Sequence, residues 1–279
     1  MGTSSSFGGL TGGNKLLPPW AQDPALNSPD QPNSKGNLGN VPLEPNGENQ
    51  PQWVRMPSWR GPKSLMRQYA SGRGGLQRTA KSYVRAKGGA KAAARSAVAG
   101  KRATARLGGF LSDVTRYGFR QAVEKLGLRD SIGQPIEAVF ATIAQLLTPP
   151  GATLEHHIAR RATNDALAAV FYKFDVSESG LEKLDRMDEA TVCDAVKDCV
   201  QNYLFQRWLQ ELGDRIEKHA VTSDQAIRLE RDVKAYVKEA VKLDLGKLDV
   251  MNMDWNGPQI RNTMDSIFAD AYSMLEVGE

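Results

Sequence analysis

From about residue 103 onward, apolar residues recur every three or four positions, the spacing that places them on one face of an α-helix. The pattern predicts a first helix over 103–127, with Leu107, Phe110 and Val114 on its apolar side. Alternation of β-branched and polar residues, which is typical of strands, is nearly absent. We therefore predict an all-α fold in which a C-terminal helical bundle of five to seven helices covers about 170 residues.

Start and stop signals set the ends of the other predicted helices. A second helix over 136–147 ends before Pro149-Pro150-Gly151. Further helices are expected to begin at Thr153, at Asp188, at Thr222 with Gln225 in a capping box, and at Gly257-Pro258.

Composition divides the chain into three predicted segments. Residues 1–60 are rich in Pro, Gly, Asn and Ser and have too little apolar surface to offset the entropy of ordering, so we expect a disordered or extended tail. Residues 61–107 form a basic Gly/Ala-rich segment, for which we expect short helices at 63–70, 77–87 and 90–98 that are mobile without a partner. Residues 108–279 form an acidic helical domain.

Tryptophan is unusual in such a tail, which contains Trp20, Trp53 and Trp59. We interpret these residues as anchors for a groove on a partner or on the helical body of this protein. The alternative is that they are accidental apolar residues of a linker.

The net charge of +4 hides a sharp division. Residues 51–112 carry 14 Lys and Arg and no acidic residue, whereas residues 113–279 carry 20 basic against 28 acidic residues. The basic segment could bind nucleic acid through phosphate contacts, or it could dock on an acidic protein or on the acidic helices of the same chain. A solvated linker is a third interpretation. The candidate positions are Lys81, Arg85, Lys87, Lys91, Arg95, Lys101, Arg102 and Arg106.

Motifs of catalysis are missing from the sequence. There is no phosphate-binding loop and no His-Glu-x-x-His, and the adjacent His156 and His157 point about 100° apart on a helix, which disfavours a shared metal. Cys193 and Cys199 fall on different helix faces, so we expect no disulfide and a reducing, cytoplasmic location. No apolar run is long enough for a membrane helix. We predict a non-enzymatic protein without catalytic residues, metal or cofactor.

The start of the chain offers chemistry of another kind. Methionine followed by glycine favours removal of Met1, which would expose the α-amine of Gly2. With an ordinary pKa of about 7.7–8.0, that amine is partly neutral at cellular pH and can act as a nucleophile. The following small residues could thread a narrow channel of a partner: Thr3, Ser4, Ser5, Ser6, Phe7, Gly8 and Gly9.

This opening, followed by a Pro/Asn/Trp tail, a basic Gly/Ala stretch and a helical C-terminal body, resembles the QatB family of the four-gene bacterial Qat antiphage defence systems. The resemblance implies three partners: an ATPase of the QatA type, a QueC-like deazaguanine synthase of the QatC type and a TatD-like nuclease of the QatD type. It further implies that Gly2 accepts a deazaguanine-type group from the QueC-like partner.

Two other functions stay open. The second is a nucleic-acid-binding adaptor that uses the basic segment and has no role for the amine. The third is an N-myristoylated, membrane-associated protein, because Met-Gly-x-x-x-Ser matches the myristoylation pattern with Ser6 in the required place.

Overall fold

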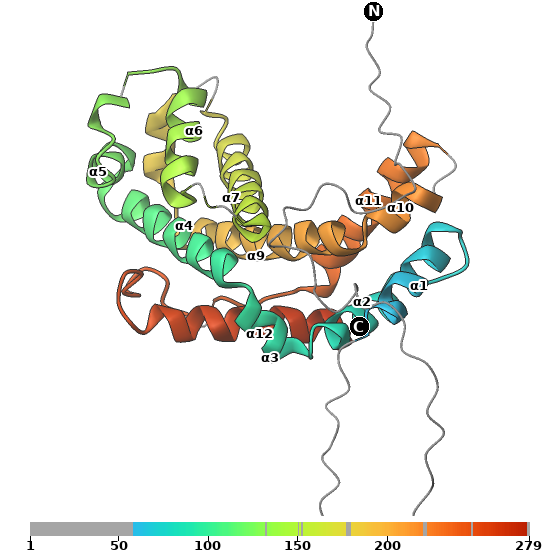
Figure 1. Ribbon diagram of the computed structural model, residues 1–279. Helices are drawn as coiled ribbons and strands as arrows, with labels where there is room; N and C mark the ends of the chain where they lie inside the picture. Colours follow the sequence, from blue (N-terminus) through green and yellow to red (C-terminus); the bar gives the residue numbers. More distant parts are fainter. Residues whose placement is uncertain are drawn as a thin grey trace, which may run out of the picture. The chain divides into compact units, whose positions relative to one another are not determined.

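The computed structural model describes residues 58–131, 133–149, 151, 153–176, 180–219, 222–246 and 248–277. Within these ranges the secondary structure is helical and contains no strand, which confirms the predicted all-α class (Figure 1). The helices are α1 Arg60–Ala70, α2 Leu76–Ala86, α3 Ala90–Ser96, α4 Val98–Tyr117, α5 Phe119–Lys125, α6 Ile136–Leu147, α7 Leu154–Lys173, α9 Glu189–Leu212, α10 Asp214–His219, α11 Ser223–Ala240 and α12 Ile260–Val277, with 3-10 turns η3 Arg129–Ser131 and η4 Leu181–Arg186.

Two of the predicted helix caps form as expected. The Asp188 carboxylate accepts a hydrogen bond from the Thr191 amide at 2.9 Å, and the Thr222 hydroxyl accepts one from the Gln225 amide at 3.2 Å. Thr153 precedes α7 but makes no side-chain capping bond; its hydroxyl contacts Nδ1 of His156 instead.

The first predicted helix, 103–127, is divided into α4 and α5 at Gly118. This glycine has φ 85°, a left-handed conformation that L side chains rarely adopt, and it turns the chain between the two helices. The Asp185 carboxylate, from η4, accepts a hydrogen bond from the Phe119 amide at 2.7 Å and so satisfies the exposed start of α5. α4 also begins earlier than expected, at Val98, directly after Ala97 ends α3.

The core surrounds α9, which is buried on nearly all sides and contacts α7 and α4 most extensively. A helix with this distribution is a central core helix rather than a surface one. Its buried residues include Tyr203, Leu204, Trp208 and Leu212, which all have 0% exposure. α12 lies along α2 and α3 and brings Phe268 and other apolar residues into the same core (Figure 1).

The basic segment is better ordered than its composition suggests. Met66, Tyr83 and Val84 are fully buried, and Ala93 and Ala97 pack into the same core. Alanine allows α3 to approach α12 closely, while the few large side chains of α1 and α2 supply the apolar area. The described residues accordingly all belong to one compact unit, 54–279.

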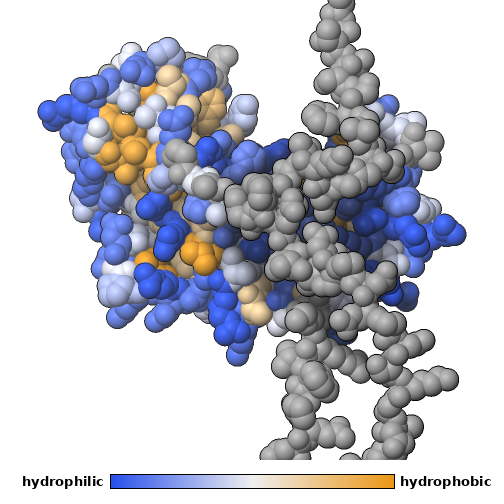
Figure 2. All heavy atoms as spheres, viewed as in Figure 1, coloured by the Kyte–Doolittle hydropathy of each residue, from blue (hydrophilic) through white to orange (hydrophobic). Residues whose placement is uncertain are grey.

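Two further features concern the surface. In the view of Figure 2, apolar residues gather over the end of the molecule formed by α5, α6 and α7, and the exposed large apolar residues of these helices include Leu146 and Tyr172. None of the helices in the described ranges combines the length and the apolar character that crossing a membrane requires.

Candidate functional site

The sites predicted near the N-terminus lie outside the described residues. They comprise Gly2, Thr3, Ser4, Ser5, Ser6, Phe7, Gly8, Gly9, Trp20 and Trp53. Trp59 is described: it precedes α1, is half-buried and meets the Tyr83 ring edge-on, with a centroid separation of 6.0 Å. It therefore contacts the helical body of its own chain.

Lys87, at the end of α2, lies under this aromatic pair. Its Nζ is 5.7 Å from the centre of the Trp59 ring and 5.4 Å from that of Tyr83, and its side chain is only 5% exposed. The ammonium donates to both carboxylate oxygens of Glu211 on α9, at 2.8 and 3.0 Å. Burial lowers the pKa of Lys87, and the Glu211 carboxylate acts in the opposite direction because it favours the charged form.

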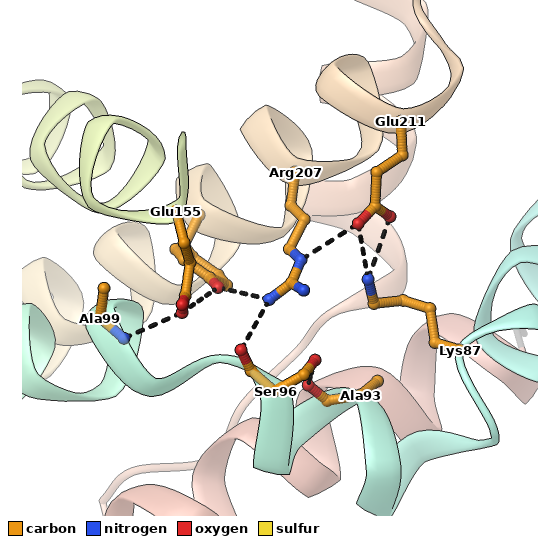
Figure 3. Close-up of polar contacts among 8 residues, drawn as sticks. Lys87, Ala93, Ser96, Ala99, Glu155, Arg207 and Glu211 are labelled. Carbon is orange, nitrogen blue, oxygen red and sulfur yellow. Dashed lines mark hydrogen bonds and ion pairs between the residues drawn. The ribbon is translucent and has the colours of Figure 1, made fainter. Parts of the chain in front are cut away.

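Glu211 is shared with Arg207, one helical turn earlier on α9. The guanidinium donates through Nε to Glu211 at 3.3 Å, and through Nη1 to the Tyr203 hydroxyl at 2.7 Å and to the Ser96 carbonyl at 3.2 Å (Figure 3). The Tyr203 hydroxyl donates in turn to Glu155 of α7 at 3.0 Å.

Glu155 completes the arrangement by accepting a hydrogen bond from the Ala99 amide at 2.9 Å, at the start of α4 (Figure 3). We call Lys87, Glu155, Tyr203, Arg207 and Glu211 the buried polar network. Through side chains and the backbone of residues 96 and 99, it joins α2, α3, α4, α7 and α9. Lys87 and Arg207 share the Glu211 carboxylate, and Glu155 is bonded to the Tyr203 hydroxyl and the Ala99 amide, so the charged groups are satisfied within the fold.

The buried phenols around the network and the two thiols of α9 favour their neutral forms. Burial raises the pKa of Tyr83 well above its usual range and also raises that of Tyr203 and Tyr272. Burial likewise raises the pKa of the Cys199 thiol to about 11 and that of Cys193 above its ordinary value. The thiolate and phenolate forms that act as nucleophiles or bases are thus disfavoured at neutral pH.

The eight basic candidates divide into three groups. Three have acidic partners on α9 or α12: Lys87 with Glu211, Lys101 with Asp265, and Arg85 with Glu276 at 3.4 Å. Arg106 donates to the Leu147 carbonyl at 3.4 Å. Within the described chain the other four are exposed and make no ion pair, namely Lys81, Lys91, Arg95 and Arg102.

His157 and two acidic residues of α9, Asp194 and Asp198, do not belong to the buried polar network. His157 is exposed in the first turn of α7, and Asp194 and Asp198 pair with Lys173 and Lys238, both at 3.5 Å. Among the described residues, no three His, Cys, Asp or Glu side chains gather in a way that could hold a metal ion.

Sequence reasoning missed Glu155, Tyr203, Arg207 and Glu211. A signal was present on α9, where Arg207 and Glu211 fall between the apolar residues Leu204, Trp208 and Leu212. Charged residues four positions apart within an otherwise apolar stretch favour a buried pair.

In a comparison with protein families, residues 88–275 match the family described as Qat anti-phage system associated protein QatB. The matched region begins directly after Lys87 and contains the rest of the buried polar network. Comparison with curated proteins and with solved structures gives no significant match.

Proposed function

Because the chain belongs to the QatB family of the Qat anti-phage system, it has a role in anti-phage defence, and we propose that it acts there as a non-enzymatic adaptor. The internal bonding of the buried polar network supports this proposal, since its charges serve the fold. The protonated state of the buried Cys199 thiol, whose pKa is about 11, supports it further.

The chemically active part of the adaptor, in this proposal, is the α-amine of Gly2 after removal of Met1. A QueC-like partner would use ATP to convert a deazaguanine carboxylate to an acyl adenylate, releasing pyrophosphate. The neutral amine would attack the acyl carbon, so that an amide bond forms, AMP leaves and the amine gives up a proton. The observation that carries this step is the Met1-Gly2 start, because glycine adds no side chain that would crowd the attack.

Thr3 to Gly9 would occupy the channel that leads to the partner's active site. Their small side chains suit a narrow passage, and Phe7 offers the single large group by which the partner could fix the register of the segment. An ATPase of the QatA type and a TatD-like nuclease of the QatD type complete the set of proposed partners.

Intact-mass spectrometry tests the proposal directly. The full chain is co-expressed with a QueC-like synthase of the same system, and we expect a Met-trimmed protein that carries an added mass of nucleobase size. Tandem spectra should place that mass on Gly2. An unmodified Met-trimmed protein under these conditions contradicts the proposal.

Two variants separate trimming from acceptance. Gly2→Ala keeps a small residue that permits removal of Met1, and we expect reduced modification because the added methyl group crowds the amine. Gly2→Leu blocks trimming, so it should abolish both the modification and the defence against phage. Gly8→Ala serves as the matched control, because it changes a glycine of the same segment away from the reacting amine.

A nucleic-acid-binding adaptor is the second candidate, favoured by the four exposed basic residues that have no ion pair in the described chain. Changing these four residues to glutamate should abolish salt-dependent binding of duplex DNA if this candidate is correct. Lys87 and Lys101 are left unchanged in this test, because their ion pairs belong to the fold.

A further inference from the structure

A small cavity lies where the start of α4 meets the end of α6 and the start of α7. It has a volume of about 230 Å³ and is lined by Ala99, Arg102, Ala103, Arg106, Leu147, Thr148, Pro149, His156 and Ala159. The apolar part of its wall is formed by three alanines and Leu147, which are all buried.

The charge lining this cavity has one sign. Arg102 and Arg106 are one turn apart on α4 and both contribute to the lining, whereas no acidic side chain does so. Arg102 makes no hydrogen bond or ion pair with the described residues. Arg106 uses one nitrogen to donate to the Leu147 carbonyl, so that most of its donors stay available while the guanidinium is positioned.

Glu155, which is next to His156 in the sequence, bonds to the buried polar network instead. It accepts from the Ala99 amide and from the Tyr203 hydroxyl, at 2.9 and 3.0 Å, and it does not line the cavity. The two arginines are therefore not neutralised from this side, and they lie beside the start of α7, whose helix dipole adds partial positive charge.

His156 supplies a third polar group. Its Nδ1 contacts the Thr153 hydroxyl, which leaves Nε2 as the other ring nitrogen able to bond to a ligand. Gly151 lies so close to the ring that a Cβ there would be 2.3 Å from its Cγ, and this contact restricts the ring on one face. The histidine is thus held in one orientation at the cavity wall.

We propose that this cavity, the α4–α7 cavity, binds the phosphate group of a small phosphomonoester such as a nucleoside monophosphate. Arg102 and Arg106 would donate to the phosphate oxygens in the bidentate manner that favours arginine over lysine at such sites. A monoester fits better than the backbone of a duplex, because the cavity has a buried apolar wall and room for one phosphate group. The proposal is independent of any modification at Gly2.

Isothermal titration calorimetry on the full chain tests this site with adenosine monophosphate, inorganic phosphate and adenosine as probes. We expect the monophosphate and inorganic phosphate to bind and adenosine not to bind. Arg102→Gln should weaken binding of the monophosphate at least about tenfold, since it removes charge-assisted hydrogen bonds. Because Arg102 is exposed and makes no hydrogen bond or ion pair with the described residues, this variant should keep the thermal stability of the parent.

Arg95→Gln is the matched control, since Arg95 is also exposed and unpaired in the described chain but does not line the cavity. Retained affinity in Arg95→Gln, with loss in Arg102→Gln and His156→Gln, supports the site. Equal losses in all three variants, binding of adenosine as tight as that of the monophosphate, or no binding of either phosphate probe overturns it. Tighter binding of duplex DNA without terminal phosphates, weakened equally by the arginine variants, also overturns it.

Discussion

Replacing Glu211 with glutamine should destabilise the protein strongly, because Glu211 is the carboxylate that two largely buried cations share. The side chains of Lys87 and Arg207 are 5% and 13% exposed, and both donate to Glu211. The variant leaves both charges without their counter-ion in a region poor in water. Breaking a buried pair in this way costs about 3–5 kcal/mol; we expect about 3 kcal/mol, because the Glu211 side chain itself is 24% exposed.

The Lys87→Met variant distinguishes this explanation from a simple pairwise one. It leaves Glu211 bonded to Arg207 and partly in contact with water, and the methionine can still pack against Trp59 and Tyr83. We therefore expect a cost of only about 1 kcal/mol. If the pair acted alone, the two variants would be equally destabilised; the shared carboxylate predicts that the glutamine variant is the worse of the two.

Urea denaturation followed by tryptophan fluorescence measures these differences, since Trp208 and Trp59 lie near the network. Asp113→Asn is the matched control: it makes the same chemical change in an ion pair with Lys125 of similar length, 2.9 Å, whose side chains are 39% and 48% exposed. This control should cost less than about 1 kcal/mol. A Glu211→Gln variant no less stable than the control would refute the reasoning.

Three further expectations concern pH, a turn and a cap. The free energy of unfolding should fall as the pH rises from about 10 to 11, because burial keeps Tyr83 and Tyr272 protonated in the folded state whereas the same phenols ionise near pH 10 in the unfolded chain. Each of the two residues costs up to about 1.4 kcal/mol per pH unit. Urea titrations at several pH values check this. Gly118→Ala should cost about 1–2 kcal/mol, because φ is 85°, and a thermal melt that matches the parent would contradict this. Asp188→Ala should cost about 1 kcal/mol in denaturant titrations, whereas Thr153→Ala, at a position without a capping bond, should cost less.

Local patterns were enough to predict most of the helices but not the point where the first one breaks. α9 and α11 begin at capping residues that bond to backbone within three positions, so the sequence carries the whole signal. The turn at Gly118 depends in addition on the bond from the Phe119 amide to Asp185, which lies 66 residues after Phe119. A glycine inside an apolar periodic stretch is compatible with a continuous helix, and only the tertiary contact decides between the two.

The buried polar network could not be assembled from sequence for the same reason. Lys87 and Glu211 are 124 residues apart, and Ala99 and Glu155 are 56 apart. The numbers of charged residues show that the basic segment is followed by an acidic helical domain, which favours ion pairs between the two. These numbers do not identify the residues that pair. Burial decides this: Lys87 enters the aromatic surroundings of Trp59 and Tyr83, where only a partner of opposite charge keeps it ionised at moderate cost.

The pairing also changes how the charge of the basic segment must be understood. Residues 51–112 have no acidic residue, yet Arg85, Lys87 and Lys101 direct their charges to acidic groups on α9 and α12. A variant that reversed every charge of the segment would therefore unfold the junction of α2, α4 and α9 as well as remove a ligand surface. Substitutions in the four exposed basic residues without an ion pair, which include Arg102 at the α4–α7 cavity, test ligand binding without unfolding the protein, because these charges contribute little to stability.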